Sequence, residues 1–194
     1  MLCTQIEGNL NDPSFEIALR RRLGGDFAVD AVTLDWDETR RRVLRVTSES
    51  GLDVGIRLGD AGLSRGLADG DVLGVRESGS DGRPAVVVVR LRSAEVLQVE
   101  LDRGDVLALA HAAWEIGNMH APLFRGDELP GTVQLLTPRT LPLERVLVRI
   151  PGVRLSTAQR TLDQARRFTA ASFDTVVRCA PDLKVIRRSA GEGA

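Results

Sequence analysis

Histidine, cysteine and lysine are scarce in this sequence, which contains two histidines, two cysteines and a single lysine, Lys184. Cys3 and Cys179 lie near opposite ends of the chain and show no C-x-x-C spacing, so a disulfide framework is excluded. We expect both cysteines to be free, reduced thiols.

Charge of one sign and long apolar runs are also missing. The 26 basic residues nearly balance the 27 acidic ones, giving a net charge of −1, which supplies no strong attraction to nucleic acid or to an anionic membrane. No apolar stretch approaches the length that spans a bilayer, and the residues after Met1 do not resemble a signal peptide. We therefore expect a cytoplasmic protein with neither nucleic acid nor membrane among its partners.

The parts of common catalytic sites are absent as well. The sequence has no glycine-rich phosphate loop with its lysine and hydroxyl, and no nucleophile elbow. Two histidines cannot fill the three protein positions of a catalytic zinc site. Acidic residues are plentiful, but no pair of carboxylates lies in an apolar stretch of sequence that would single it out for acid–base catalysis. We expect that the chain is not an enzyme.

The 194 residues are 43% apolar and 27% charged, which suffices for a folded core without covalent staples. Residues 1–26 read as an N-terminal extension with one short helix. Asp12 is its expected cap, Pro13 its first residue and Gly24-Gly25 its stop.

Residues 27–93 carry short segments of period two separated by turn residues, which predicts an all-β N-terminal domain. The expected strands begin near Val29 and continue at 43–47, 54–58, 72–75 and 85–91. Trp36 and the adjacent Arg40–Arg42 run are consistent with a partner surface, but an aromatic core residue beside a solvated charge run is the reading we favour.

Residues 94–162 change to an alternation of strands and helices. The pattern predicts a strand at 95–101, a helix at 103–116, strands at 120–124 and 132–136, and a turn between these two strands. This order is the first part of a ferredoxin-like β-α-β-β-α-β unit.

Two readings of the next segment are open. In the favoured one, residues 143–150 form a helix and 153–159 a strand; in the other, 145–150 form a strand and 156–168 a helix. Residues 163–194 then form a C-terminal tail with possible strands at 175–178 and 184–186.

The segment from Asp105 to Phe124 is the best candidate for a functional site. An apolar helical run is expected to end near Ile116, with Gly117 as its left-handed cap, and Pro122 prevents the helix from continuing. His120 is thereby placed at the edge of an ordered element. Neutral imidazole binds nickel, copper and zinc, although a lone histidine is more often a hydrogen-bonded surface or core group.

Two blocks resemble a known family. Gly117-Asn118-Met119-His120-Ala121-Pro122-Leu123 is similar to the helix-ending Gly-Asn-x-His motif of the urease accessory proteins E (UreE), which are nickel metallochaperones. The block from Leu34 to Val75 resembles the N-terminal signature of the same family. The resemblance implies an α+β protein in which an all-β, peptide-binding-like domain (27–93) precedes a ferredoxin-like βαββαβ metal-binding domain (94–162).

The resemblance also implies a mechanism. In a homodimer, two copies of His120 would meet at a two-fold axis and share one nickel ion, with zinc or copper binding possible in vitro. The implied partners are the urease accessory GTPase and the urease apoprotein complex, and the implied role is delivery of nickel during urease maturation.

The chain departs from the family pattern in ways that keep a second hypothesis open. Glu115 stands where many members have a histidine, Leu143-Glu144-Arg145 replaces a His-x-His pair, and residues 189–194 lack histidine. His111 lies four residues before Glu115, so both share a helix face. They are a secondary ligand pair, a hydrogen-bonded pair or unrelated, and we favour a non-ligand role for His111. The alternative function is a UreE-like adaptor that binds partner proteins but little metal.

Overall fold

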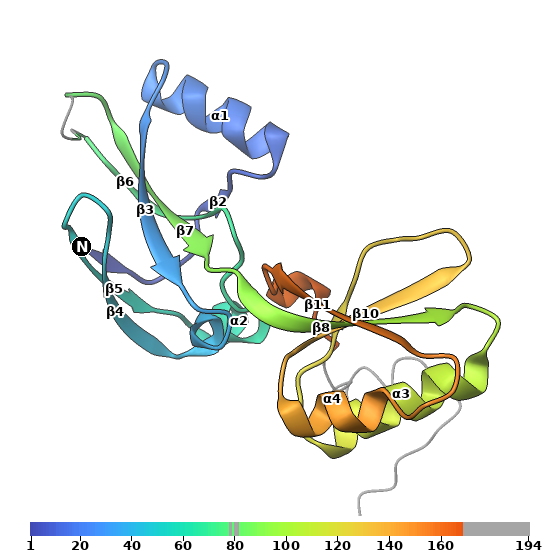
Figure 1. Ribbon diagram of the computed structural model, residues 1–194. Coiled ribbons are helices and arrows are strands. Elements are labelled where there is room, and N and C mark those ends of the chain that lie inside the picture. Colours follow the sequence, from blue (N-terminus) through green and yellow to red (C-terminus); the bar gives the residue numbers. More distant parts are fainter. Residues whose placement is uncertain (78, 80–81, 169–194) are drawn as a thin grey trace, which may run out of the picture.

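The computed structural model describes residues 1–77, 79 and 82–168, which form an α+β fold with two regions (Figure 1). The first region holds two sheets, and the second holds one sheet with two helices beneath it. Within the described residues, no helix combines the length and hydropathy that crossing a bilayer requires.

The first region contains two sheets that face each other. Their strand orders are β1-β5-β4 and β2-β6-β7-β3. The strands are β1 (Leu2–Cys3), β2 (Gly8–Asn9), β3 (Ala28–Leu34), β4 (Val43–Thr47), β5 (Asp53–Arg57), β6 (Asp71–Arg76) and β7 (Ala85–Leu91). Buried side chains from both sheets, among them Val32, Ile56 and Val89, form one core cluster. The strands expected from periodicity are therefore confirmed to within two residues at their ends.

Helix α1 (Pro13–Leu23) covers the opposite face of the larger sheet, as Figure 1 shows. Its start and stop agree with the sequence, since the Asp12 side chain accepts a hydrogen bond from the Ser14 amide and Gly24 is left-handed at φ 75°. Leu19 is buried against Val86 and Val88. Both faces of the larger sheet are thus covered, which explains why Val86–Val89 is a continuous apolar run.

Residues 1–26, expected to be an extension with one helix, also contribute two strands to the sheets of the first region. β1 pairs with β5 in parallel and β2 pairs with β6, so the first nine residues contribute one short strand to each sheet. Two-residue strands carry no period that a sequence pattern can reveal. The first region is also not purely β, because α1, the short helix α2 (Asp60–Arg65) and a 3₁₀ turn, η1 (Glu38–Arg40), belong to it.

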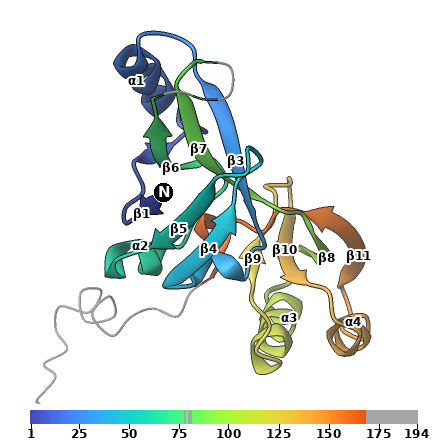
Figure 2. The same cartoon turned by 90° about the vertical axis from the view of Figure 1, so that its left-hand side faces the viewer.

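The second region has the element order β8-α3-β9-β10-α4-β11 and the strand order β11-β8-β10-β9. Its elements are β8 (Ala94–Asp102), α3 (Val106–Asn118), β9 (Phe124–Arg125), β10 (Thr132–Pro138), α4 (Leu141–Leu147) and β11 (Arg154–Arg160). Both helices lie on one face of the sheet (Figure 2), where Leu97 and Val99 pack against residues such as Ile116 and Leu143. The helix expected at 143–150 and the strand at 153–159 are confirmed, and the alternative reading is wrong.

A small apolar cluster joins the two regions. The rings of Trp36 and Phe124 meet edge to face with centroids 6.1 Å apart, and Leu162 is buried in the same cluster. The Gln164 side chain, in the 3₁₀ turn η2 (Gln164–Arg166), donates to the Trp36 carbonyl at 3.0 Å. Trp36 is therefore a packing residue between regions, and residues 163–168 are part of the folded body. The tail strands expected at 175–178 and 184–186 lie outside the described residues.

Two expectations about the central segment are wrong. The strand expected at 120–124 is reduced to β9, because His120 is left-handed and Pro122 has no amide hydrogen to donate to a ladder. The helix also does not stop at Ile116, since α3 continues through Gly117 to Asn118.

Candidate functional site

The site is built on α3, whose first turn is held by a side-chain cap. The Asp105 carboxylate accepts a hydrogen bond from the Ala108 amide at 3.0 Å, as expected for an N-cap acid. Ala108, Ala112 and Ile116 form the buried stripe of the helix against the sheet. The far end of α3 is therefore fixed in position by packing that extends over about two turns.

The helix ends in a Schellman motif. The His120 amide donates to the Gly117 carbonyl at 2.9 Å and the Ala121 amide donates to the Ile116 carbonyl at 3.1 Å, which is the hydrogen-bond pair that defines this cap. Ala121 packs against the core cluster that contains Ile116, supplying the apolar contact that accompanies the motif. The cap fixes the backbone on both sides of His120.

His120 occupies the left-handed position of this cap, with φ 53°, and is the one non-glycine residue with positive φ in the described chain. Glycine usually holds this position, because a Cβ there clashes with the backbone and costs of order 1 kcal/mol. The side chain is exposed, and its imidazole makes no hydrogen bond or ion pair to any described residue. A strained, exposed and unpartnered side chain points to a role outside the single chain.

His111 has a different environment. Its Nε2 lies 3.5 Å from the Glu115 carboxylate, one turn further along α3. Gly117 is six residues beyond His111, roughly 9 Å along the helix axis. The structure thus brings His111 and Glu115 together, and it places His111 more than two helical turns before His120. Within the described residues, no three His, Cys, Asp or Glu side chains form a metal-binding group.

The outward face of α3 is apolar. Val106, Leu107 and Trp114 are exposed, with 84% of Leu107 and 62% of Trp114 accessible to solvent, and Ala110 lies between them on the same face. We call these four residues the α3 face. Such a surface on a helix whose other side is already buried indicates a second binding partner.

The sequence contains signals for both the Schellman cap at the end of α3 and the α3 face. The last turn was marked by Ile116 and Ala121, the pair that a Schellman motif brings into contact, with Pro122 directly behind them. The α3 face was marked by apolar residues all round the helix, a pattern typical of burial on two sides. Periodicity alone identified the helix but not which apolar stripe faces the core.

Comparison with known proteins identifies relatives across most of the chain. Residues 4–90 match the family described as "UreE urease accessory protein, N-terminal domain". A protein named urease accessory protein UreE from Helicobacter pylori (strain G27) is 31% identical over 167 residues, which cover 84% of this chain and 91% of the relative. The protein of that name from Helicobacter acinonychis is 29% identical over 192 residues, covering 97% of this chain and 100% of the relative.

A third relative, from Actinobacillus pleuropneumoniae and also named urease accessory protein UreE, is 34% identical over 147 residues, covering 74% of this chain and 68% of its own length. Matches that cover 74% to 97% of the chain necessarily include residues of both regions of the fold. The chain therefore belongs to the urease accessory protein UreE family, a family of accessory proteins and not of enzymes.

Proposed function

We propose that this protein is a metallochaperone that carries nickel, as its cargo, to the urease active site during urease maturation. The proposal assigns the second region, residues 94–162, as a ferredoxin-like metal-binding and dimerisation domain, and residues 27–93 as a peptide-binding-like domain. Its implied partners are the urease accessory GTPase and the urease apoprotein complex, in the cytoplasm. The observation that carries the proposal is the unpartnered His120 imidazole at the end of an exposed apolar helix face.

A homodimer explains both halves of that observation. A two-fold axis through the α3 face would bury Leu107 and Trp114 against their copies, because an isologous interface pairs a surface with itself. The same axis would bring the two His120 side chains near each other, supplying two imidazoles from one residue. One described chain offers no three-residue metal group, so a shared site is the arrangement that this residue set supports.

The chemistry of the shared site suits a carrier. Neutral imidazole is a good nickel ligand, and zinc and copper also accept it. Two imidazoles leave the coordination shell incomplete, so water or a partner's ligand completes it, and release to an acceptor requires few bonds to break. The Schellman cap holds the His120 backbone in place before metal arrives, which reduces the ordering cost of binding. Glu115 and His111, paired with each other, remain a secondary ligand pair of lower priority.

The test is a calorimetric titration of the apo protein with nickel. We expect about one nickel ion per dimer, and complete loss of high-affinity binding in His120→Ala, because symmetry removes both imidazoles at once. His111→Ala is the matched control, since it also removes a histidine from the same segment but should retain the stoichiometry. Equal and complete loss in both variants would place His111 among the ligands.

Unchanged nickel binding in His120→Ala would refute the site. Absence of nickel binding in the parent protein would instead favour the adaptor function, in which the chain binds partner proteins but carries little metal.

A further inference from the structure

Strand β11 leaves one edge of the second sheet open. It is the outermost strand in the order β11-β8-β10-β9 and pairs over all seven residues with β8 alone. Figure 2 shows it at the rim of the sheet with α4 beneath it. Its backbone makes no further hydrogen bond within the described chain. The opposite edge is blunted, since Phe124 of β9 pairs with Arg167 and the Phe168 amide donates to the Leu123 carbonyl.

A groove runs beside this open edge. It has a volume of about 420 Å³ and lies between α4 and β11, where it is lined by Leu141, Glu144, Arg145, Val148 and residues 155–157. Leu141 and Val148 are 60% and 65% exposed. The groove thus offers apolar surface directly alongside backbone groups that lack a strand partner.

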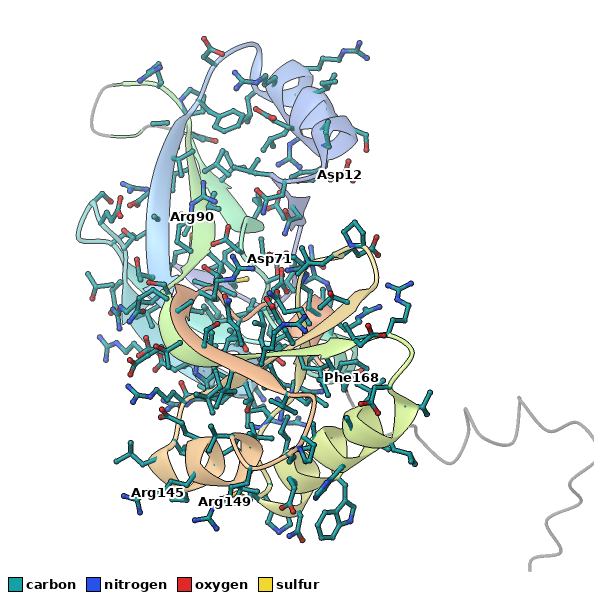
Figure 3. The ribbon with its side chains drawn as sticks, turned by 45° about the vertical axis from the view of Figure 1, so that its right-hand side comes forward. Asp12, Asp71, Arg90, Arg145, Arg149 and Phe168 are labelled. Carbon is teal, nitrogen blue, oxygen red and sulfur yellow. The ribbon has the colours of Figure 1, made fainter. Side chains whose placement is uncertain are left out.

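The charge around the groove is positive. Arg145 of α4 lines the groove, and Arg149 follows in the turn after the helix. Both project away from the body of the protein (Figure 3), and neither makes an ion pair or side-chain hydrogen bond with any described residue. The one acid lining the groove, Glu144, accepts a hydrogen bond from Arg139 at 2.8 Å. An acidic ligand therefore meets two free guanidinium groups without a competing carboxylate.

We propose that the groove between α4 and β11 binds an extended, acidic segment of a partner protein, which adds to the sheet as a fifth strand beside β11. Backbone hydrogen bonds to β11 supply affinity, and alternate side chains of the segment enter the groove against Leu141 and Val148. Acidic side chains two residues away, on the same face of the segment, pair with Arg145 and Arg149. The site involves neither His120 nor the α3 face. A result that refutes nickel binding by this protein would therefore leave this proposal untouched, and the reverse is also true.

The probes are two synthetic nine-residue peptides in which every second residue is threonine and the remaining positions alternate valine with a charged residue, glutamate in one peptide and lysine in the other, so that valine and charge share one face of the strand. We expect fluorescence anisotropy with the full chain to show that the glutamate peptide binds at least about tenfold more tightly. The double variant Arg145→Glu, Arg149→Glu should weaken that binding by about tenfold or more. Arg103→Glu is the matched control, because Arg103 is exposed at the turn before α3 and should leave binding unchanged.

Proline tests the strand edge. Neighbouring amides of a strand point to opposite sides, so only one of Ser156→Pro and Thr157→Pro preserves the ladder with β8. We expect that variant to keep its circular dichroism spectrum and lose peptide binding. Should neither fold, the arginine variants decide the question.

Three results would overturn the proposal. They are equal binding of the two peptides, no binding of either peptide up to about 1 mM, and an affinity for the glutamate peptide that is the same in the parent and in the Arg145→Glu, Arg149→Glu variant. Sedimentation that shows a self-association lost with the folded proline variant would instead make a second copy of this chain the occupant, and would overturn it too.

Discussion

At the scale of single residues, His120 holds a position where glycine would be the more stable choice. Its φ of 53° and its Schellman hydrogen bonds place a Cβ in the left-handed region. Histidine, like asparagine, enters this region more often than most residues, but it still pays a steric cost. The folded chain is therefore less stable than it would be with glycine at this position, but it carries an exposed imidazole on a fixed backbone.

This leads to a prediction for two variants that both lack the imidazole. His120→Gly should be more stable than His120→Ala by about 1 kcal/mol, since only glycine adopts the cap conformation without strain. Urea unfolding of the apo proteins at equal concentration measures the difference. If His120→Ala matched or exceeded His120→Gly, the left-handed conformation would not be a source of strain.

Asp30 is the second residue with a measurable consequence. Its carboxylate accepts hydrogen bonds from the hydroxyls of Ser48 at 2.8 Å and Ser50 at 2.6 Å, and from the Ser50 amide at 2.9 Å. Burial raises the pKa of Asp30, but the hydrogen bonds from Ser50 and Ser48, with Arg76 nearby, outweigh it and leave the pKa below its ordinary value. The carboxylate thereby ties β3 to the turn between β4 and β5.

A lowered folded-state pKa means that the stabilisation is fully present above the unfolded pKa of about 3.9 and is lost as pH falls through the folded value. We expect Asp30→Asn to cost about 1–3 kcal/mol at pH 7, because hydrogen bonds to a charged group are lost. Unfolding measured in urea across a pH series should show that cost shrinking below about pH 4. A cost that stayed constant down to about pH 2 would contradict this role.

At the scale of elements, α3 is apolar on two sides, and the sheet satisfies only one of them. Ala108, Ala112 and Ile116 face the sheet, whereas Leu107 and Trp114 face solvent. The inner stripe contains two alanines, which let the first turns of the helix pack closely on the sheet. The outer one uses large side chains, which suit an interface with a second chain.

We expect Leu107→Glu and Trp114→Glu to give folded monomers, since each places a carboxylate in the proposed apolar interface without disturbing the inner stripe. Sedimentation velocity reports the mass, and circular dichroism reports the fold. Ile17→Glu is the matched control, because Ile17 is 53% exposed on α1, far from α3 in the sequence and in the fold. Dimers persisting in both α3 variants would assign the interface elsewhere.

At the scale of the whole molecule, the two regions share an apolar contact, and this contact should couple their unfolding. Trp36 comes from the first region, Phe124 from the second, and Gln164 from the segment that closes over both. Loss of this contact leaves each region with its own core, since the two main clusters share no residue.

Trp36→Ala should therefore cost about 2–3 kcal/mol and divide one calorimetric transition into two. Trp36→Phe keeps an aromatic ring against Phe124 and should retain a single transition at a slightly lower temperature. Two transitions in the parent protein would show that the regions already unfold independently.

The sequence by itself determined the elements whose signals are local. Asp12-Pro13 and Gly24 set the ends of α1 because a cap and a proline act within one turn. Alternation set the strand around Val43 because a half-buried sheet imposes period two, and a short continuous apolar run set the strand that begins at Ala85. The Gly-Asn-x-His motif likewise marked His120 without any coordinates.

Tertiary structure decided what depends on contacts between distant residues. β1 and β2 exist because β5 and β6 offer them partners, and two residues alone carry no period. Gly117 stayed helical because Ile116 and Ala121 close the helix later, which moved the left-handed conformation onto His120. Which apolar stripe of α3 faces outward was also settled by packing, since the sheet can cover only one side of a helix.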